Sequence, residues 1–173
     1  CTWLTSITLP KSLRKIGEYA FGRYHECKNL SEVHISDVAA WCEIEFEVDD
    51  SNPLRYAKKL YLNEDLVENL VIPEGVTEIA SHAFSDCQSL TSITLPKSLR
   101  KIGTRAFSKC VNLSEVHISD IAAWCGIKID YGSQENTSYK SAFSLIITKL
   151  HNILKHFIYR HFPSDLSLPF SIH

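Results

Sequence analysis

Two short motifs contain the residues best suited to chemistry: Glu32 with His34, and Glu115 with His117. A carboxylate and an imidazole two positions apart suit acid–base catalysis or metal binding, but either role needs a third group. Each pair alternates with apolar residues, which is the period of a β-strand with one buried face. The strands expected between the pairs separate them by about 19 Å, so neither completes the other. We therefore expect polar residues on a solvated sheet face and no enzyme, metal or cofactor site.

The cysteines are the second group of reactive residues. No Cys-x-x-Cys pair is present, which leaves a zinc site with little support. Stacked layers would place Cys87 and Cys110 about 4.8 Å apart, but side chains in register run parallel, whereas a disulfide needs β-carbons about 3.8 Å apart. We expect buried thiols that fill the core, with a bridged or reactive thiol as the alternative. The six cysteines are Cys1, Cys27, Cys87 and Cys110, which share one repeat position, and Cys42 and Cys125, which follow tryptophans.

Other motifs favour structural roles. No G-x-S-x-G motif and no phosphate-binding glycine loop is present. Asp37 and Asp120 each precede a (Val/Ile)-Ala-Ala-Trp segment, and we expect each to cap a short helix whose tryptophan packs inward. Basic residues cluster at 11–15 and 97–101, which is more typical of solvated surface than of a polyanion site. The net charge of −2 argues against nucleic acid as a partner.

An internal repeat determines the elements that position these residues. The sequence LTSITLPKSLRKIG occurs at 4–17 and again, unchanged, at 90–103. Within this duplication lies a 23-residue period, in which Pro73 recurs as Pro96 and Cys87 as Cys110. Cys1 occupies the position of Cys87, so the chain starts in the middle of a repeat. The absence of Met at position 1 indicates a processed product or a piece of a longer protein.

Each repeat predicts one strand and one return. Leu-x-x-Ile-x-Leu alternates in the manner of a strand, and Ile-Gly-x-x-Ala-Phe-x-x-Cys supplies further apolar residues that face inward. A single unit of this size cannot bury its own apolar side, so the units must stack. Stacking places the strands side by side in a parallel sheet.

The pattern LxxIxLPxxLxxIGxxAFxxC, together with LVIPEGVTEIASHAFSDC at 70–87, resembles the BspA-like leucine-rich repeat family. The resemblance implies an α/β leucine-rich-repeat solenoid, horseshoe-like, with a parallel β-sheet on one face and short helical or irregular returns on the other. We assign residues 1–132 to this solenoid, with an irregular insert at about 37–66.

The repeat pattern ends near residue 132, and 133–173 form an atypical basic tail. Apolar residues at 143–157 follow helical spacing, which predicts an amphipathic helix. Three interpretations stay open: a helix that covers the end of the solenoid, a sequence accident without a selected role, and a helix that contacts a membrane or a partner. Membrane contact is the least favoured of the three.

The expected function is non-catalytic binding through the exposed sheet face. The family resemblance implies a segment of a cell-surface or secreted adhesion protein that contacts host or extracellular proteins, or glycans. The alternative is a structural spacer or stalk without its own ligand. The candidate binding row consists of Ser6, Thr8, Glu32, His34, Tyr61, Asn69, Val71, Ser92, Thr94, Glu115 and His117.

Overall fold

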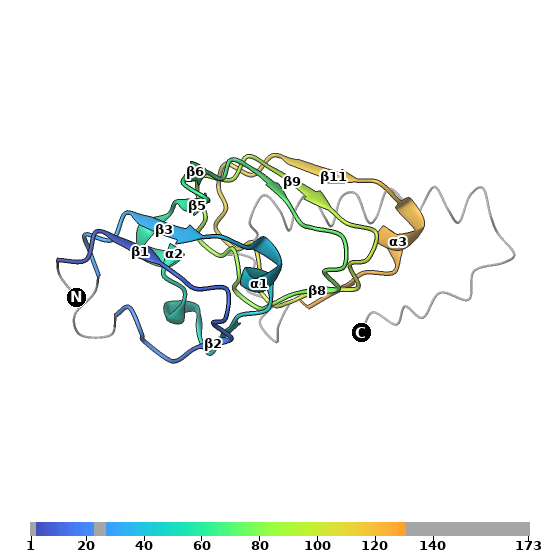
Figure 1. The fold of residues 1–173 in the computed structure, drawn as a ribbon. Helices are drawn as coiled ribbons and strands as arrows, with labels where there is room; N and C mark the ends of the chain where they lie inside the picture. The colour runs from blue at the N-terminus through green and yellow to red at the C-terminus, as the bar shows by residue number, and fades with distance from the viewer. Residues whose placement is uncertain (1–2, 23–26, 131–173) are drawn as a thin grey trace, which may run out of the picture.

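The computed structural model describes residues 3–22 and 27–130 (Figure 1). Two ladders of parallel strands form one side of the molecule. The first ladder contains β1 (Ser6–Thr8), β3 (Glu32–Ile35) and β5 (Leu60–Leu62), to which β6 (Asp65–Leu66) adds antiparallel. The second ladder contains β7 (Asn69–Val71), β9 (Ser92–Leu95) and β11 (Glu115–Ile118).

The return side is also built from parallel strands, each two residues long. One ladder pairs β2 (Lys15–Ile16) with β4 (Glu45–Phe46). The other pairs β8 (Glu78–Ile79) with β10 (Lys101–Ile102) and β10 with β12 (Lys128–Ile129). Figure 1 shows β2 and β8 on the side opposite β3 and β9. The sequence predicts helical or irregular returns, and these short ladders are an addition to that prediction.

Short helices follow the strands that carry the Glu-x-His pairs. Helices α1 (Val38–Cys42) and α3 (Ile121–Cys125) are the predicted ones. The side chain of Asp37 accepts a hydrogen bond from the Ala40 N–H, and that of Asp120 accepts one from the Ala123 N–H, so both predicted caps are confirmed. Trp41 is buried, as is its counterpart in α3. The insert adds the 3-10 helix η1 (Asp49–Ser51) and α2 (Leu54–Ala57).

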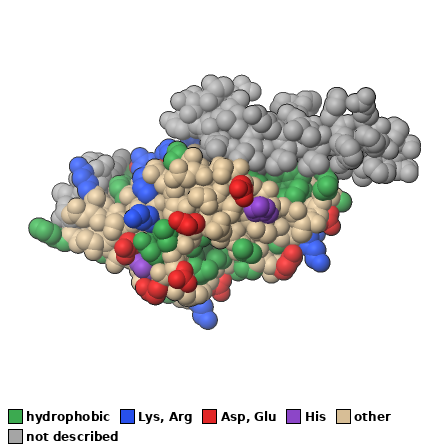
Figure 2. Space-filling view, turned by 90° about the horizontal axis from the view of Figure 1, so that it is seen from above, with side chains coloured by type: hydrophobic (Ala, Val, Ile, Leu, Met, Phe, Trp, Pro, Cys, Tyr) green, Lys and Arg blue, Asp and Glu red, His purple; other side chains and the backbone are tan. Residues whose placement is uncertain are grey.

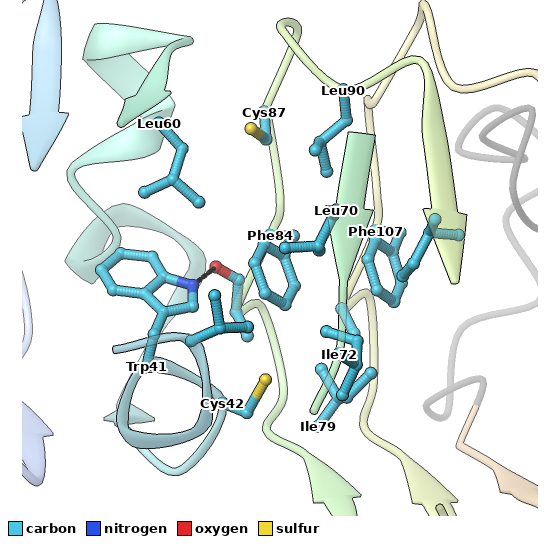
Figure 3. Close-up of a cluster of buried hydrophobic side chains, with 14 of the residues drawn as sticks. Trp41, Cys42, Leu60, Leu70, Ile72, Ile79, Phe84, Cys87, Leu90 and Phe107 are labelled. Atoms are coloured by element: carbon cyan, nitrogen blue, oxygen red, sulfur yellow. Dashed lines mark hydrogen bonds between the residues drawn. The ribbon is translucent and has the colours of Figure 1, made fainter. Parts of the chain in front are cut away.

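The core lies between the strand side and the return side (Figure 3). Register places equivalent apolar residues side by side, so that Leu70 pairs with Ile93 and Ile93 with Val116. The rings of Phe84 and Phe107, one repeat apart, stack with centroids 5.2 Å apart. The structure thus confirms stacked repeat units with a shared core, and the horseshoe curvature stays a prediction.

The expectation of one continuous sheet is wrong, because the ladder breaks after β5. Asn63 and Glu64 both have positive φ, 49° and 73°, and turn the chain back into β6. Since β6 occupies the free edge of β5, β7 begins a second ladder. The two halves are joined instead through loops: the Lys58 carbonyl accepts hydrogen bonds from the N–H groups of Gln88 (2.8 Å) and Ser89 (3.3 Å).

The predicted helix at 143–157 and Cys1 lie outside the described residues. Among the residues that are described, no helix has the length and apolar character required to cross a bilayer.

Candidate functional site

The candidate site is the outward face of the two strand ladders. Backbone pairing brings the predicted residues into rows across neighbouring strands. In the first ladder, Ser6 lies beside Glu32, and Thr8 beside His34. The second ladder has two rows. They are Asn69–Ser92–Glu115 and Val71–Thr94–His117.

His34 is the centre of the first ladder's face. Its ring stacks on that of Tyr61 from the next strand, with centroids 4.8 Å apart and an angle of 14° between the planes. Its Nε2 lies 3.1 Å from a carboxylate oxygen of Glu32. The carboxylate of Glu64 lies 3.8 Å from Nδ1, which has no hydrogen-bond partner among the described residues. Glu64 is not predictable from the sequence, because only the β5–β6 turn brings it to this face.

The second ladder offers a more open version of the same motif. Nε2 of His117 lies 3.3 Å from the Glu115 carboxylate, and both side chains are well exposed. Ser92 is a correction to the predicted row, since it is buried. It lies on the central strand, between the flanking residues Asn69 and Glu115, and its hydroxyl donates to the Asn69 side-chain oxygen at 2.7 Å.

The geometry suits recognition by hydrogen bonds and ring contacts. The two Glu-x-His pairs lie on different ladders and do not share a site. Within residues 3–22 and 27–130, no three His, Cys, Asp or Glu side chains are grouped as a metal would require. Figure 2 shows histidine side chains at separate places in the view from above, beside acidic side chains.

A polar cluster holds the insert against the next repeat. Asp49 Oδ1 lies 3.2 Å from Nδ1 of His82 and accepts a hydrogen bond from the Ser85 hydroxyl at 3.1 Å. Arg55 donates to its other oxygen at 3.0 Å. The hydrogen bond with His82 foremost, then the positive charge of Lys109 and the Ser85 hydroxyl, hold the pKa of Asp49 well below its usual range against the opposing effect of burial. The neighbouring Asn52 is fully buried and donates to the His82 carbonyl, so Asp49, Asn52 and His82 form a joint between the insert and the next repeat.

The cysteines behave as core residues. Cys42 and Cys87 are buried, and burial raises the pKa of Cys42 to about 12 and that of Cys87 to about 11. At neutral pH such thiols are protonated and poor nucleophiles. The Cys110 thiol donates to the Phe84 carbonyl at 3.0 Å. The predicted buried thiols are confirmed for the five described cysteines, all of which are free and buried.

Comparison with known proteins identifies the family. Residues 1–45 and 57–126 match the model for the BspA type leucine rich repeat region, in six copies. No curated protein matches the chain. The crystal structure of a leucine rich cell surface protein from Faecalibacterium prausnitzii A2-165 is similar, with 23% identity and a TM-score of 0.42, over 74% of this chain and 36% of that one. The chain thus spans only about a third of that protein's length. Because the family model covers well over half of its residues, the chain belongs to the BspA-type leucine-rich repeat family.

Proposed function

We propose that this chain is a protein-binding module of a cell-surface protein and that it contacts an extracellular protein through the outward face of its strand ladders. The observation that carries the proposal is the Thr8–His34–Tyr61 row, which the backbone holds in register although its side chains do not build the core. A rigid, preorganised surface of this kind loses little conformational entropy on binding. Family membership supports surface display and a partner outside the cell.

The first ladder is the stronger half of the proposed surface. The His34–Tyr61 stack restricts both rings, and the carboxylates of Glu32 and Glu64 flank it. Aromatic side chains that are already ordered are the typical anchors of protein interfaces. The second ladder supplies more exposed polar contacts around His117.

The test measures binding of the whole chain to a panel of immobilised extracellular-matrix proteins by biolayer interferometry. The double variant His34→Ala/Tyr61→Ala should weaken binding to any partner found by about tenfold or more, because it removes a preordered ring pair. The matched control is Lys128→Ala on the return side, which should leave binding unchanged.

The spacer hypothesis predicts a different result. If no panel member binds, or if the double variant binds as tightly as the unmodified chain while retaining its circular dichroism spectrum, the proposed binding face is wrong and a spacer role is favoured.

A further inference from the structure

The ladder on the return side is interrupted at the insert. In a regular stack the layer of β5 would add a return strand between β4 and β8, just as β10 lies between β8 and β12. In the described part of the chain, β4 pairs only with β2 and β8 only with β10. One edge of β4 and one edge of β8 are therefore left without a neighbouring strand.

The hydrogen bonds show which groups of β4 are unpaired. The N–H groups of Glu45 and Glu47 donate to the carbonyls of Arg14 (2.9 Å) and Ile16 (3.3 Å) in and beside β2. In a parallel pair only alternate residues bond to a given neighbour. The backbone N–H and C=O of Phe46 therefore point away from β2, toward the open side.

Strand β8 also has unpaired backbone groups on one side within the described residues. The carbonyls of Thr77 and Ile79 accept hydrogen bonds from the N–H groups of Lys101 (3.1 Å) and Gly103 (2.8 Å) in and beside β10. The backbone N–H and C=O of Glu78 therefore point away from β10. Among the described residues, both strands thus present an unpaired donor and an unpaired acceptor on the side where the ladder is interrupted.

A cleft of about 1120 Å³ lies between these edges, with residues of both strands in its walls. Phe46 lines one wall, and Val76 and Glu78 line the other. The N–H of Ala80 donates to the carbonyl of Cys42 at 2.9 Å and ties the walls together. The volume is slightly above the range typical of small-molecule sites, about 300–1,000 Å³.

The charge of the lining indicates the chemistry of the occupant. Five glutamates line the cleft, and Arg105 is the lining residue of opposite formal charge. Lysines outside the lining pair with three of the five: Lys15 with Glu45 and Glu47, and Lys101 with Glu78. Glu43 and Glu74 are exposed and make no ion pair with the described residues.

We propose that this cleft binds an extended, basic segment of a partner protein, which adds a strand at the open edges of β4 and β8. Backbone hydrogen bonds to Phe46 and Glu78 would hold the segment, as in other cases where a peptide adds to a sheet edge. Its basic side chains would pair with Glu43 and Glu74. This surface is on the opposite side of the molecule from the proposed binding face and is independent of it.

The test uses the full chain and a fluorescein-labelled peptide, acetyl-(Thr-Lys)4-amide, in fluorescence anisotropy at low salt. We expect saturable binding with one peptide per chain. Two control peptides use the unmodified protein: (Thr-Glu)4, which reverses the charge, and (Thr-Lys)4 with alternate N-methylated amides, which removes the N–H donors of one edge. Both should bind on the order of tenfold more weakly or not at all.

Protein variants locate the site. Glu43→Lys/Glu74→Lys should weaken binding of the basic peptide by about tenfold, since two attractive charges become repulsive. The matched double variant Asp65→Lys/Glu68→Lys makes the same change in net charge at two exposed residues, one in β6 and one just after it, and should have little effect. Equal losses in the two double variants, or equal binding of the N-methylated peptide, would overturn the proposal. Self-association of the chain through this cleft would also overturn it. In that case the peptide would not bind, and sedimentation would show an oligomer that Glu43→Lys/Glu74→Lys abolishes.

Discussion

Residues 31–42 and 114–125 differ at only one position, yet they lie in different surroundings. The side chain of His34 is 15% exposed, whereas that of His117 is 57% exposed. Val38 is buried at 6%, but Ile121 at the same position is 53% exposed. The difference arises because β3 lies between β1 and β5, whereas β11 pairs only with β9 in the described residues. Exposure in a repeat protein is therefore set by the adjoining layers as much as by the local sequence.

The tryptophans show the same contrast in hydrogen bonding. Trp41 Nε1 donates to the Ala83 carbonyl of the following repeat at 3.0 Å (Figure 3). Trp124 is equally buried, but its Nε1 has no partner among the described residues. The indole N–H thus stabilises the first copy and imposes a desolvation cost on the second.

The largest expected effect on stability comes from the joint between the insert and the next repeat, which distinguishes the first copy. The Asn52 amide donates to the carbonyls of His82 (2.7 Å) and Ala83 (3.0 Å) and accepts from the Leu54 N–H (2.9 Å). Asn52→Ala should lower the free energy of unfolding by about 2–4 kcal/mol in urea titrations, because it leaves buried backbone groups with fewer partners. Asn112→Ala, which removes one exposed hydrogen bond, is the control. Equal losses would show that Asn52 does not hold the insert.

The tryptophan contrast predicts the next largest effect. Trp41→Phe removes both packing volume and a hydrogen bond, while Trp124→Phe removes volume and an unpaired N–H. We expect Trp41→Phe to cost about 1–2 kcal/mol more than Trp124→Phe in the same titrations. If Trp124→Phe lowers the free energy of unfolding as much as Trp41→Phe or more, the two environments do not differ in their effect on stability.

The joint also predicts a dependence on pH. The folded-state pKa of Asp49 is lowered, chiefly by His82, so its stabilisation is present above the unfolded value of about 4 and is lost as the pH falls further. Asp49→Asn should remove on the order of 1 kcal/mol of the stability difference between pH 7 and pH 3. The exposed Asp65→Asn serves as the control, and an unchanged pH profile in Asp49→Asn would contradict the prediction.

The helix caps predict the smallest difference between the copies. Asp37 and Asp120 accept from backbone N–H groups at 3.0 and 2.9 Å. Asp37→Ala and Asp120→Ala should each lower the free energy of unfolding by about 1 kcal/mol. Because the interaction lies within one turn, the two losses should agree closely in thermal denaturation. A clear inequality would show that even local capping depends on the neighbouring layer.

Much of the fold was predictable because it depends on spacing along the chain. Alternation placed Val33 in the core and Glu32 outside it, and the cap of α1 follows from Asp37 alone. The burial of Ser92 was not predictable from the same alternation, since it depends on which residues flank it on the adjacent strands.

The sequence by itself determined the repeat, the stacking of its units, the capped helices and the buried thiols, because each follows from local patterning that any stacked arrangement must satisfy. Only the tertiary structure decided where the sheet breaks, how the two Glu-x-His copies differ, and that a cleft lies between β4 and β8. These features depend on how the insert packs between the two halves. Packing of this kind is set by contacts between residues distant in sequence, such as Trp41 and Ala83, which no local pattern records.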